Sequence, residues 1–312
     1  FGYGPGFIIK TTDGGATWFQ ISSGTGNTLI DIAGFSNGDK IAVGESGTLL
    51  TNQSGSSLWT LRSGITQSHL KAVQVLNTTD VVIVDDSAKV YKSSDSGLNW
   101  ITASSAPTEL SSVEDIHFNN LQDGWLIGYG FVNGALFHTT DGGTNWNHIP
   151  DFLGGYISLD VEGSNLWAAN VTGLYYRSTD NGNTWIEGNL PDFPFNIQDM
   201  DFFDANIGYA VGWGGQAFRS ADGGVSWQVL PTPNANDQLT DIYLVGPNEI
   251  WISSNSNKAY YSANGGQGWA LLDIGSTGFG SFSSIYATTA GDAWVVGYEG
   301  FIEYFAGTPP PP

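Results

Sequence analysis

A repeated motif constrains this chain more than any other feature of its sequence. A short pattern of Ser or Thr, any residue, Asp, any residue, Gly, two further residues and Trp recurs roughly every 42 residues. Clear copies occupy residues 11–18, 93–100, 139–146, 178–185 and 220–227, and degenerate copies occupy residues 51–59 and 262–269. A period of this length, with short apolar runs and Gly-rich turns, indicates repeated β-sheet units rather than helices.

Each residue type in the motif has a physical role in a tight hairpin. The Asp carboxylate can accept backbone N–H groups two residues further on, the Gly adopts the positive φ that the turn demands, and the Trp ring packs over the hairpin. Two copies depart from the pattern, with Gln53 and Asn264 at the Asp position. The motif is therefore predicted to be structural, at Asp13, Trp18, Asp95, Trp100, Asp141, Trp146, Asp180, Trp185, Asp222, Trp227, Asn264 and Trp269.

Apolar segments around each motif predict four strands per repeat. Residues 29–33, 113–118 and 197–202 alternate apolar with polar residues, as an inner strand does, and a continuous apolar run typical of a buried second strand follows each of them. Third and fourth strands flank the motif. Four-stranded antiparallel units repeated in this way predict an all-β chain folded as a β-propeller. Inner strands beginning near residues 29, 68, 112, 156, 196, 239 and 281 favour seven blades over eight.

The two ends of the chain bear on how such a ring closes. Residues 7–21 supply a third and a fourth strand, whereas residues 281–305 supply a first, a second and another third strand. The sequence therefore predicts one propeller domain over residues 1–306, whose terminal strands share the closing blade. One third strand is then surplus, and pairing with a neighbouring copy is the alternative to closure within one chain. Residues 307–312 are expected to be a Pro-rich linker or tail.

The motif resembles the Asp-box, or BNR repeat, of sialidases, sortilin-type receptors, xyloglucanases and photosystem II assembly factors. The resemblance covers nearly the whole chain. It implies a propeller fold and leaves function open, because these relatives include enzymes, receptors and assembly factors. A sialidase needs three clustered arginines, whereas Arg62, Arg177 and Arg219 fall in outer hairpins. With no nucleophile motif and no metal-ligand spacing among the histidines, the chain is predicted not to be an enzyme.

The charge of the chain argues against two classes of partner. Acidic residues outnumber basic ones by 30 to 9, for a formal net charge of −21. The resulting field repels phosphate backbones and anionic lipids, so nucleic acid is not an expected partner. No apolar run is long enough for direct membrane insertion. Few Lys, a low isoelectric point and many Thr, Ser, Asn and Gly favour an extracellular or cell-surface bacterial protein, and the absence of Cys does not decide the compartment.

Two sets of residues are candidates for ligand binding. Aromatic residues in Gly-rich turns after the second strands, on the face opposite the Asp-boxes, could stack on sugars, anchor a peptide, or wedge between blades. They are Tyr3, Tyr129, Trp213 and Tyr298. Acidic residues near the starts of inner strands could hold a cation at the mouth of a central channel, or accept hydrogen bonds from their own blade. They are Asp31, Asp115, Asp199 and Asp241, and Lys71, Ser158 and Ser284 interrupt the set. No cofactor is expected beyond such a cation.

These observations favour a non-enzymatic extracellular or cell-surface propeller that acts as a binding, structural or assembly module. Its expected partner is a protein or a glycan at the face opposite the Asp-boxes. A glycan-active hydrolase of the Asp-box propeller type is the first alternative, because the many acidic residues offer carboxylate pairs. A self-assembling surface filament subunit, joined by exchange of terminal strands, is the second.

Overall fold

The structure is a computed structural model that describes most of the chain. The described residues are 7–10, 19–56, 58–62, 64–103, 107, 109–130, 134–149, 156–191, 196–273, 281–288, 292–298 and 301–305. The first Asp-box, the candidate Tyr3 and the Pro-rich segment lie outside them. The chain divides into two compact units, the first made mainly of residues 21–159 and the second mainly of residues 8–20, 160–298 and 302–312.

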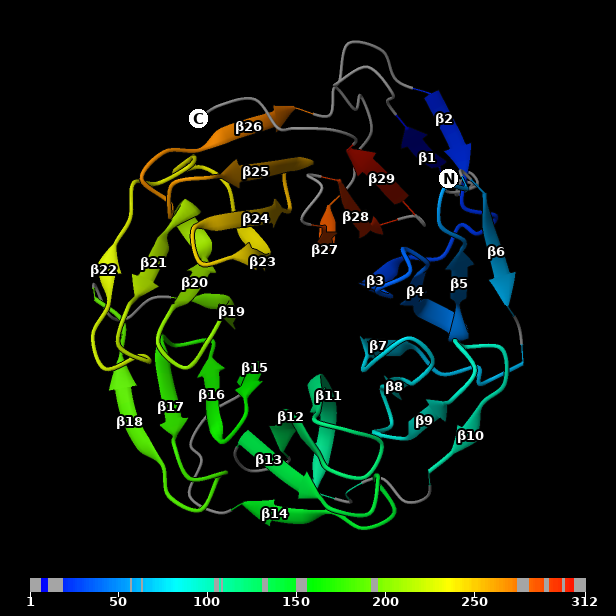
Figure 1. The fold of residues 1–312 in the computed structure, drawn as a ribbon, viewed down its shortest axis with the longest axis horizontal. Helices are drawn as coiled ribbons and strands as arrows, with labels where there is room; N and C mark the ends of the chain where they lie inside the picture. The colour runs from blue at the N-terminus through cyan, green and yellow to red at the C-terminus, as the bar shows by residue number, and fades with distance from the viewer. Residues whose placement is uncertain are drawn as a thin grey trace. The chain divides into compact units, whose positions relative to one another are not determined.

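Three sheets of four antiparallel strands build the first unit (Figure 1). We call each such sheet a blade and count its strands from first to fourth in chain order. Blade 1 is β3 (Leu29–Gly34), β4 (Lys40–Gly44), β5 (Leu49–Asn52) and β6 (Trp59–Arg62). Blade 2 is β7 (Leu70–Val75), β8 (Val81–Asp85), β9 (Val90–Ser93) and β10 (Ile101–Thr102). Blade 3 is β11 (Leu110–Phe118), β12 (Gly124–Gly130), β13 (Gly134–Thr139) and β14 (Asn147–Ile149).

Three more blades follow in the second unit, although the first residues of β15 belong to the first. Blade 4 is β15 (Tyr156–Glu162), β16 (Asn165–Asn170), β17 (Leu174–Ser178) and β18 (Ile186–Asn189). Blade 5 is β19 (Ile197–Phe202), β20 (Gly208–Gly212), β21 (Ala217–Ser220) and β22 (Gln228–Val229). Blade 6 is β23 (Leu239–Gly246), β24 (Glu249–Ser254), β25 (Lys258–Ser262) and β26 (Ala270–Asp273). Short 3-10 turns, η1 (Glu45–Gly47) and η2 (Trp213–Gly215), follow the second strands of blades 1 and 5. None of the helical segments described here has the length and apolar character to cross a membrane.

Both ends of the chain meet in one further sheet, which we call the terminal sheet. Its order is β2 (Phe19–Ser22), β1 (Phe7–Lys10), β29 (Phe301–Phe305), β28 (Ala293–Gly297) and β27 (Phe282–Ala287). Strand β1 pairs with β29 in parallel. Among the described strands, six sheets have four strands and this one has five. The prediction of seven four-stranded blades is therefore wrong: there are six, because each end of the chain brings a third strand to the remaining sheet and both are retained.

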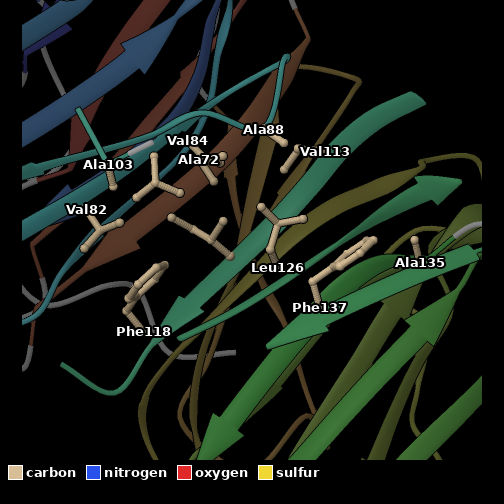
Figure 2. Close-up of a cluster of buried hydrophobic side chains, with 12 residues drawn as sticks. Ala72, Val82, Val84, Ala88, Ala103, Val113, Phe118, Leu126, Ala135 and Phe137 are labelled. Atoms are coloured by element: carbon tan, nitrogen blue, oxygen red, sulfur yellow. The ribbon is translucent and has the colours of Figure 1, made fainter. Parts of the chain in front are cut away.

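The apolar core lies between consecutive blades. Figure 2 shows one cluster, in which Val82 and Val84 of blade 2 pack with Phe118, Leu126 and Phe137 of blade 3. Equivalent clusters join blade 1 to blade 2, blade 4 to blade 5, and blade 5 to blade 6. The second strands of blades 1, 2 and 5 are buried along their length, as their continuous apolar sequence predicts. Face-to-face packing of successive four-stranded sheets is the packing of propeller blades.

An irregularity interrupts the pairing of first and second strands near its start. In blade 1 the register shifts between Leu29 and Asp31, and in blade 5 between Ile197 and Asp199. Blades 2, 3 and 6 and the terminal sheet have a shift at the equivalent place. Because two residues oppose one at a β-bulge, the strand bends and side chains are re-aimed. The bulge therefore turns the side chain of one residue in each of these first strands, such as Asp31 or Asp199, away from the regular alternation of the strand.

Candidate functional site

The Asp-box hairpin connects the third and fourth strands of a blade. In blade 5, Ser220 Oγ accepts the backbone N–H of Asp222 at 3.3 Å and that of Gly224 at 2.8 Å, and donates to Asp222 Oδ1 at 2.9 Å. Asp222 Oδ1 accepts the backbone N–H of Ser226, four residues on, at 2.8 Å. Boxes in blades 2, 3, 4 and 6 repeat this pattern. The expectation that Asp accepts the N–H two residues on is wrong, because the first hydroxyl takes that N–H.

These hydrogen bonds keep the Asp-box carboxylates ionised. Asn99 donates to Asp95 through its side chain at 2.7 Å and its backbone at 2.8 Å, which lowers the Asp95 pKa to about 2. Bonds from the residue four positions on lower the pKa values likewise at Asp141, Asp180 and Asp222. Because these hydrogen-bond donors lie in the same hairpin, each Asp-box carboxylate is satisfied by residues of its own box.

The Asp-boxes also contact the preceding blade. Trp167 Nε1, in blade 4, donates to the carbonyl of Gly223 at 2.9 Å, and the Tyr175 hydroxyl donates to that of Gly224 at 2.7 Å. Gly224 has a φ of +81°, and a Cβ there would lie 3.2 Å from Trp167 Nε1. The box therefore needs Gly at this position both for its turn and for the close approach of the neighbouring blade.

Carboxylates of the first strands join neighbouring blades. Asp31 Oδ1 accepts the N–H of Ile32 at 2.7 Å in its own strand, and Asp31 Oδ2 accepts the N–H of Val73 in blade 2 at 2.8 Å. We call a hydrogen bond from the next first strand to such a side chain a blade clasp. The other predicted acidic residues also make clasps, and they are Asp115, Asp199 and Asp241. The structure thus places these four Asp residues at bulges, where each accepts an N–H group from the next blade. Asp31, Asp115 and Asp199 also accept one from their own strand.

Further blade clasps use residues that the sequence analysis missed. Gln74 Oε1 accepts the N–H of Phe118 at 2.6 Å, and Asp160 Oδ2 accepts the N–H of Phe202 at 2.8 Å. Asp201 adds a second clasp between blades 5 and 6, by accepting the N–H of the Leu244 backbone at 2.9 Å.

The spacing of these residues explains why they were missed. Gln74 lies two residues beyond Ala72, the bulge residue of blade 2, and Asp160 lies two residues beyond Ser158, which aligns with Asp31 in sequence. A polar residue two positions after a missing Asp is the signal that could have found them. The residue that interrupts the acidic set in blade 2 is thus Ala72; Lys71 instead lies 3.7 Å from the Glu114 carboxylate.

Asp160, Asp199 and Asp201 form an acidic cluster in the second unit. Burial raises the pKa of Asp160 to about 7, against the opposing effect of its backbone hydrogen bonds and with the charges of Glu162 and Asp199 adding to the rise. Burial also raises the pKa of Asp201, and repulsion from Asp160 and Asp199 adds to it. Glycoside hydrolases use such a carboxyl as a general acid. Both oxygens of Asp160, however, accept backbone N–H groups, so this side chain is committed to the clasp.

Among the described residues, the histidines make local contacts rather than a second site. His138 Nε2 lies 2.7 Å from Asp123 Oδ1, and its ring stacks on Trp125 with a centroid separation of 3.9 Å. Burial lowers the pKa of His117 to about 4. In the part of the chain that the structure describes, no group of three or more His, Cys, Asp or Glu is arranged to hold a metal ion.

The turn between second and third strands lies at the opposite end of the third strand from the Asp-box. Trp213 in η2 and Tyr298 after β28 hold equivalent places in such turns, and their side chains are 47% and 45% exposed. Their backbones are anchored, because Trp213 N donates to Asn196 O at 3.1 Å and Tyr298 N donates to Ser281 O at 3.0 Å. Tyr129, in the first unit, was predicted in such a turn but lies within β12, where it pairs with Ser112 and Gly134. It is half-buried, and burial raises its pKa. Two of the predicted aromatics are thus presented to solvent on fixed backbone.

Blades stapled by these hairpins and joined by clasps define an Asp-box β-propeller. Solved structures share the fold. YCF48 bound to a D1 peptide is 20% identical, with a TM-score of 0.74 that covers 90% of this chain and 94% of that chain. A catalytically inactive variant of virginiamycin B lyase from Staphylococcus aureus is 13% identical, with a TM-score of 0.72 over 95% of this chain and 98% of that chain. Identities this low show the fold alone, and the fold serves enzymes as well as assembly factors.

Sequence comparison points to one group of these propellers. Residues 189–306 match the family model described as photosynthesis system II assembly factor YCF48. The photosystem II assembly lipoprotein Ycf48 of Synechococcus sp. (strain CC9902) is 32% identical over 126 residues, which are 36% of this chain and 37% of that protein. The chain thus matches little more than a third of the length of its curated relative. The predicted resemblance to photosystem II assembly factors is confirmed.

Proposed function

We propose that this chain is a non-enzymatic binding module, which holds an extended segment of a partner protein at the turns between its second and third strands. The observation that carries the proposal is the pair of exposed aromatic side chains, Trp213 and Tyr298, at equivalent turn positions. Both lie within residues 189–306, the part that resembles the assembly factors. A protein of that name was solved with a bound peptide, which supports a peptide as the kind of ligand.

The turns are suited to this task because their backbones are already fixed. Binding then costs little ordering entropy, and rigid aromatic side chains contribute large contact areas. Gly214, beside Trp213, has a φ of +70° and nothing within 4 Å of the place where a Cβ would lie. A peptide backbone can therefore approach the indole ring from that side.

The charge and composition of the chain narrow the partner and the compartment. A net charge of −21 favours a neutral or basic partner segment over an acidic one. We place the module outside the cytoplasm, secreted or at the cell surface, on the composition that the sequence shows. In this proposal residues 1–306 act as one propeller domain, and a protein segment is preferred over a glycan as ligand.

Selection from a random phage-displayed peptide library on the immobilised chain tests the proposal. Selected peptides should bind the double variant Trp213→Ala/Tyr298→Ala at least about 10-fold more weakly, which corresponds to about 1.4 kcal/mol. The matched control is Val229→Ala/Leu271→Ala, since these side chains are equally exposed, at 47% and 46%, but lie on fourth strands.

Two results would overturn this function. One is a library that yields no peptide, or peptides that bind both double variants equally. The other is turnover in a screen of polysaccharides that a single Asp or Glu substitution abolishes, because the glycan-active hydrolase would then be the correct alternative.

A further inference from the structure

The terminal sheet departs from the pairing pattern of the six blades. In all six blades the third strand runs antiparallel to both of its neighbours. In the terminal sheet, by contrast, β29 has β1 beside it in parallel, with Ile8 opposite Ile302 and Ile9 opposite Glu303. Parallel pairs are slightly less stable per residue than antiparallel ones. The strand next to β29 is thus parallel to it, whereas the third strands of the blades have antiparallel neighbours.

Sequence and connectivity explain the mismatch, because two strands compete for one role. An Asp-box follows β1 directly, at residues 11–18, as it follows the third strand of a blade. Strand β29 is also a third strand, because it comes next after the second strand β28 in the chain and lies beside it in the sheet, but residues 305–312 do not match the Asp-box. The chain therefore carries one third strand more than the sheet needs.

We propose that the terminal sheet is the joint through which copies of this chain assemble head to tail, with β1 of one copy pairing with β29 of the next. The strands that pair come from opposite ends of the chain, so a second copy offers β29 the same partner that its own chain offers. Exchange of an identical element between copies costs little, because the same hydrogen bonds form in either case. The partner that supplies β1 to the edge of β29 is therefore a second copy of this chain.

The geometry of such a joint determines the kind of assembly. The donor surface is the N-terminal strand and the acceptor surface is the C-terminal sheet, so the two surfaces differ and the contact is heterologous. A heterologous contact that does not close on itself produces an open chain of subunits. Backbone pairing at a sheet edge provides the affinity, as in other strand-addition complexes. The inference is independent of peptide binding at Trp213.

Cysteine cross-linking tests the joint, because the chain has no Cys of its own. The variants Ile9→Cys and Glu303→Cys place single thiols at partner positions of β1 and β29. When the two purified single variants are mixed and mildly oxidised, we expect disulfide dimers well above the amount that either gives alone. The double variant should give a ladder of covalent oligomers on a non-reducing gel. A cross-linked monomer from the double variant, with no dimer from the mixture, would overturn the proposal.

Three further measurements keep the result interpretable. The control pair Thr51→Cys/Thr60→Cys bridges partner positions of β5 and β6 within blade 1, so it should give only a cross-linked monomer. Light scattering of the unmodified chain should show a mass that rises with concentration, and deletion of residues 1–22 should abolish the rise. A synthetic peptide of residues 1–22 should bind the shortened chain. An unmodified chain that stays monomeric at every concentration would rule the joint out.

Discussion

Two regions of this molecule use Asp carboxylates to accept backbone N–H groups, and they differ in what those bonds join. Asp95 lies in a surface hairpin, where bonds from Asn99 lower its pKa to about 2. Asp160 lies between blades, where burial and neighbouring carboxylates raise its pKa to about 7. Hydrogen bonds dominate in the first environment and desolvation in the second. The Asp-boxes thus use the charge of the carboxylate to stabilise each hairpin, whereas at Asp160 burial opposes the charge on the carboxyl that joins two blades.

The opposite shifts imply opposite dependence of stability on pH. A box carboxylate with a lowered pKa stabilises the folded state above its usual value of 3.8, and that stability is lost as the pH falls through about 2. A clasp carboxyl with a raised pKa keeps its proton in the folded state up to about pH 7, whereas the unfolded chain releases it near 3.8. The unfolded state then binds fewer protons, so the free energy of unfolding falls as the pH rises through this window.

Removal of a clasp side chain should give the largest effect. Asp31→Ala leaves the N–H groups of Ile32 and Val73 without their acceptor between two blades, and should lower the free energy of unfolding by about 3 kcal/mol. Asp31→Asn retains one acceptor oxygen and should cost about half as much. Urea unfolding measures both. A loss below about 1 kcal/mol for the Ala variant would show that water replaces the carboxylate, and the clasp would then be dispensable.

Removal of charge from the acidic cluster should raise the free energy of unfolding. Asp201→Asn keeps an oxygen for the N–H of Leu244 and removes a charge that repels Asp160 and Asp199. At pH 8 the free energy of unfolding should rise by about 1.4 kcal/mol, the equivalent of one pKa unit. Its fall between pH 4 and pH 7 should become shallower, and urea unfolding across this range measures that slope. The control Asp180→Asn removes the same charge from an Asp-box and should destabilise the chain, so equal effects of the two variants would contradict the comparison.

Removal of an Asp-box hydroxyl should have a smaller effect than removal of a clasp. Ser220→Ala takes away the acceptor of two backbone N–H groups, one of them long at 3.3 Å, but both lie within a single hairpin and the contacts between blades are kept. We expect a loss of about 1 kcal/mol in urea unfolding. Ser226→Ala in the same box removes only an exposed donor to Asp222 and should cost less. A larger loss for Ser226→Ala would reverse the assigned roles of these two hydroxyls.

The smallest expected effect is a change in the pKa of one Asp-box carboxyl, that of Asp95. NMR titration of the Asp95 carboxyl should give a pKa near 2, and Asn99→Ala should raise that value toward 3.8, because the side-chain hydrogen bond from Asn99 is the largest cause of the shift. An unchanged Asp95 pKa in Asn99→Ala would mean that the backbone donors alone hold the carboxylate ionised.

The sequence predicts most of the strands because their signals are local. Asp-boxes and apolar runs mark the third and second strands directly, and first strands begin within a few residues of the predicted positions, as at Leu29, Tyr156 and Leu239. The candidate aromatics are also visible in the sequence, but their exposure is not. Tyr129 and Trp213 stand in similar Gly-rich sequences, but Tyr129 lies half-buried within β12 and Trp213 lies exposed in η2.

Other features depend on contacts that no local pattern encodes. The acceptors Gln74 and Asp160 depend on the alignment of one blade with the next, so a search along one strand position overlooks them. The parallel pairing of β1 with β29 involves opposite ends of the chain. Counting third strands shows that one is surplus but does not show which strand lies beside which.

The blade clasps share a direction that bears on how the chain is made. In each described clasp the acceptor side chain belongs to the earlier blade and the N–H to the later one, as when Asp31 bonds Val73 and Asp241 bonds Ile285. During synthesis from the N-terminus, a finished blade therefore already carries the acceptor that the next strand requires. Each new strand can be captured as it leaves the ribosome, so the emerging chain is guided into register by the part that has already folded.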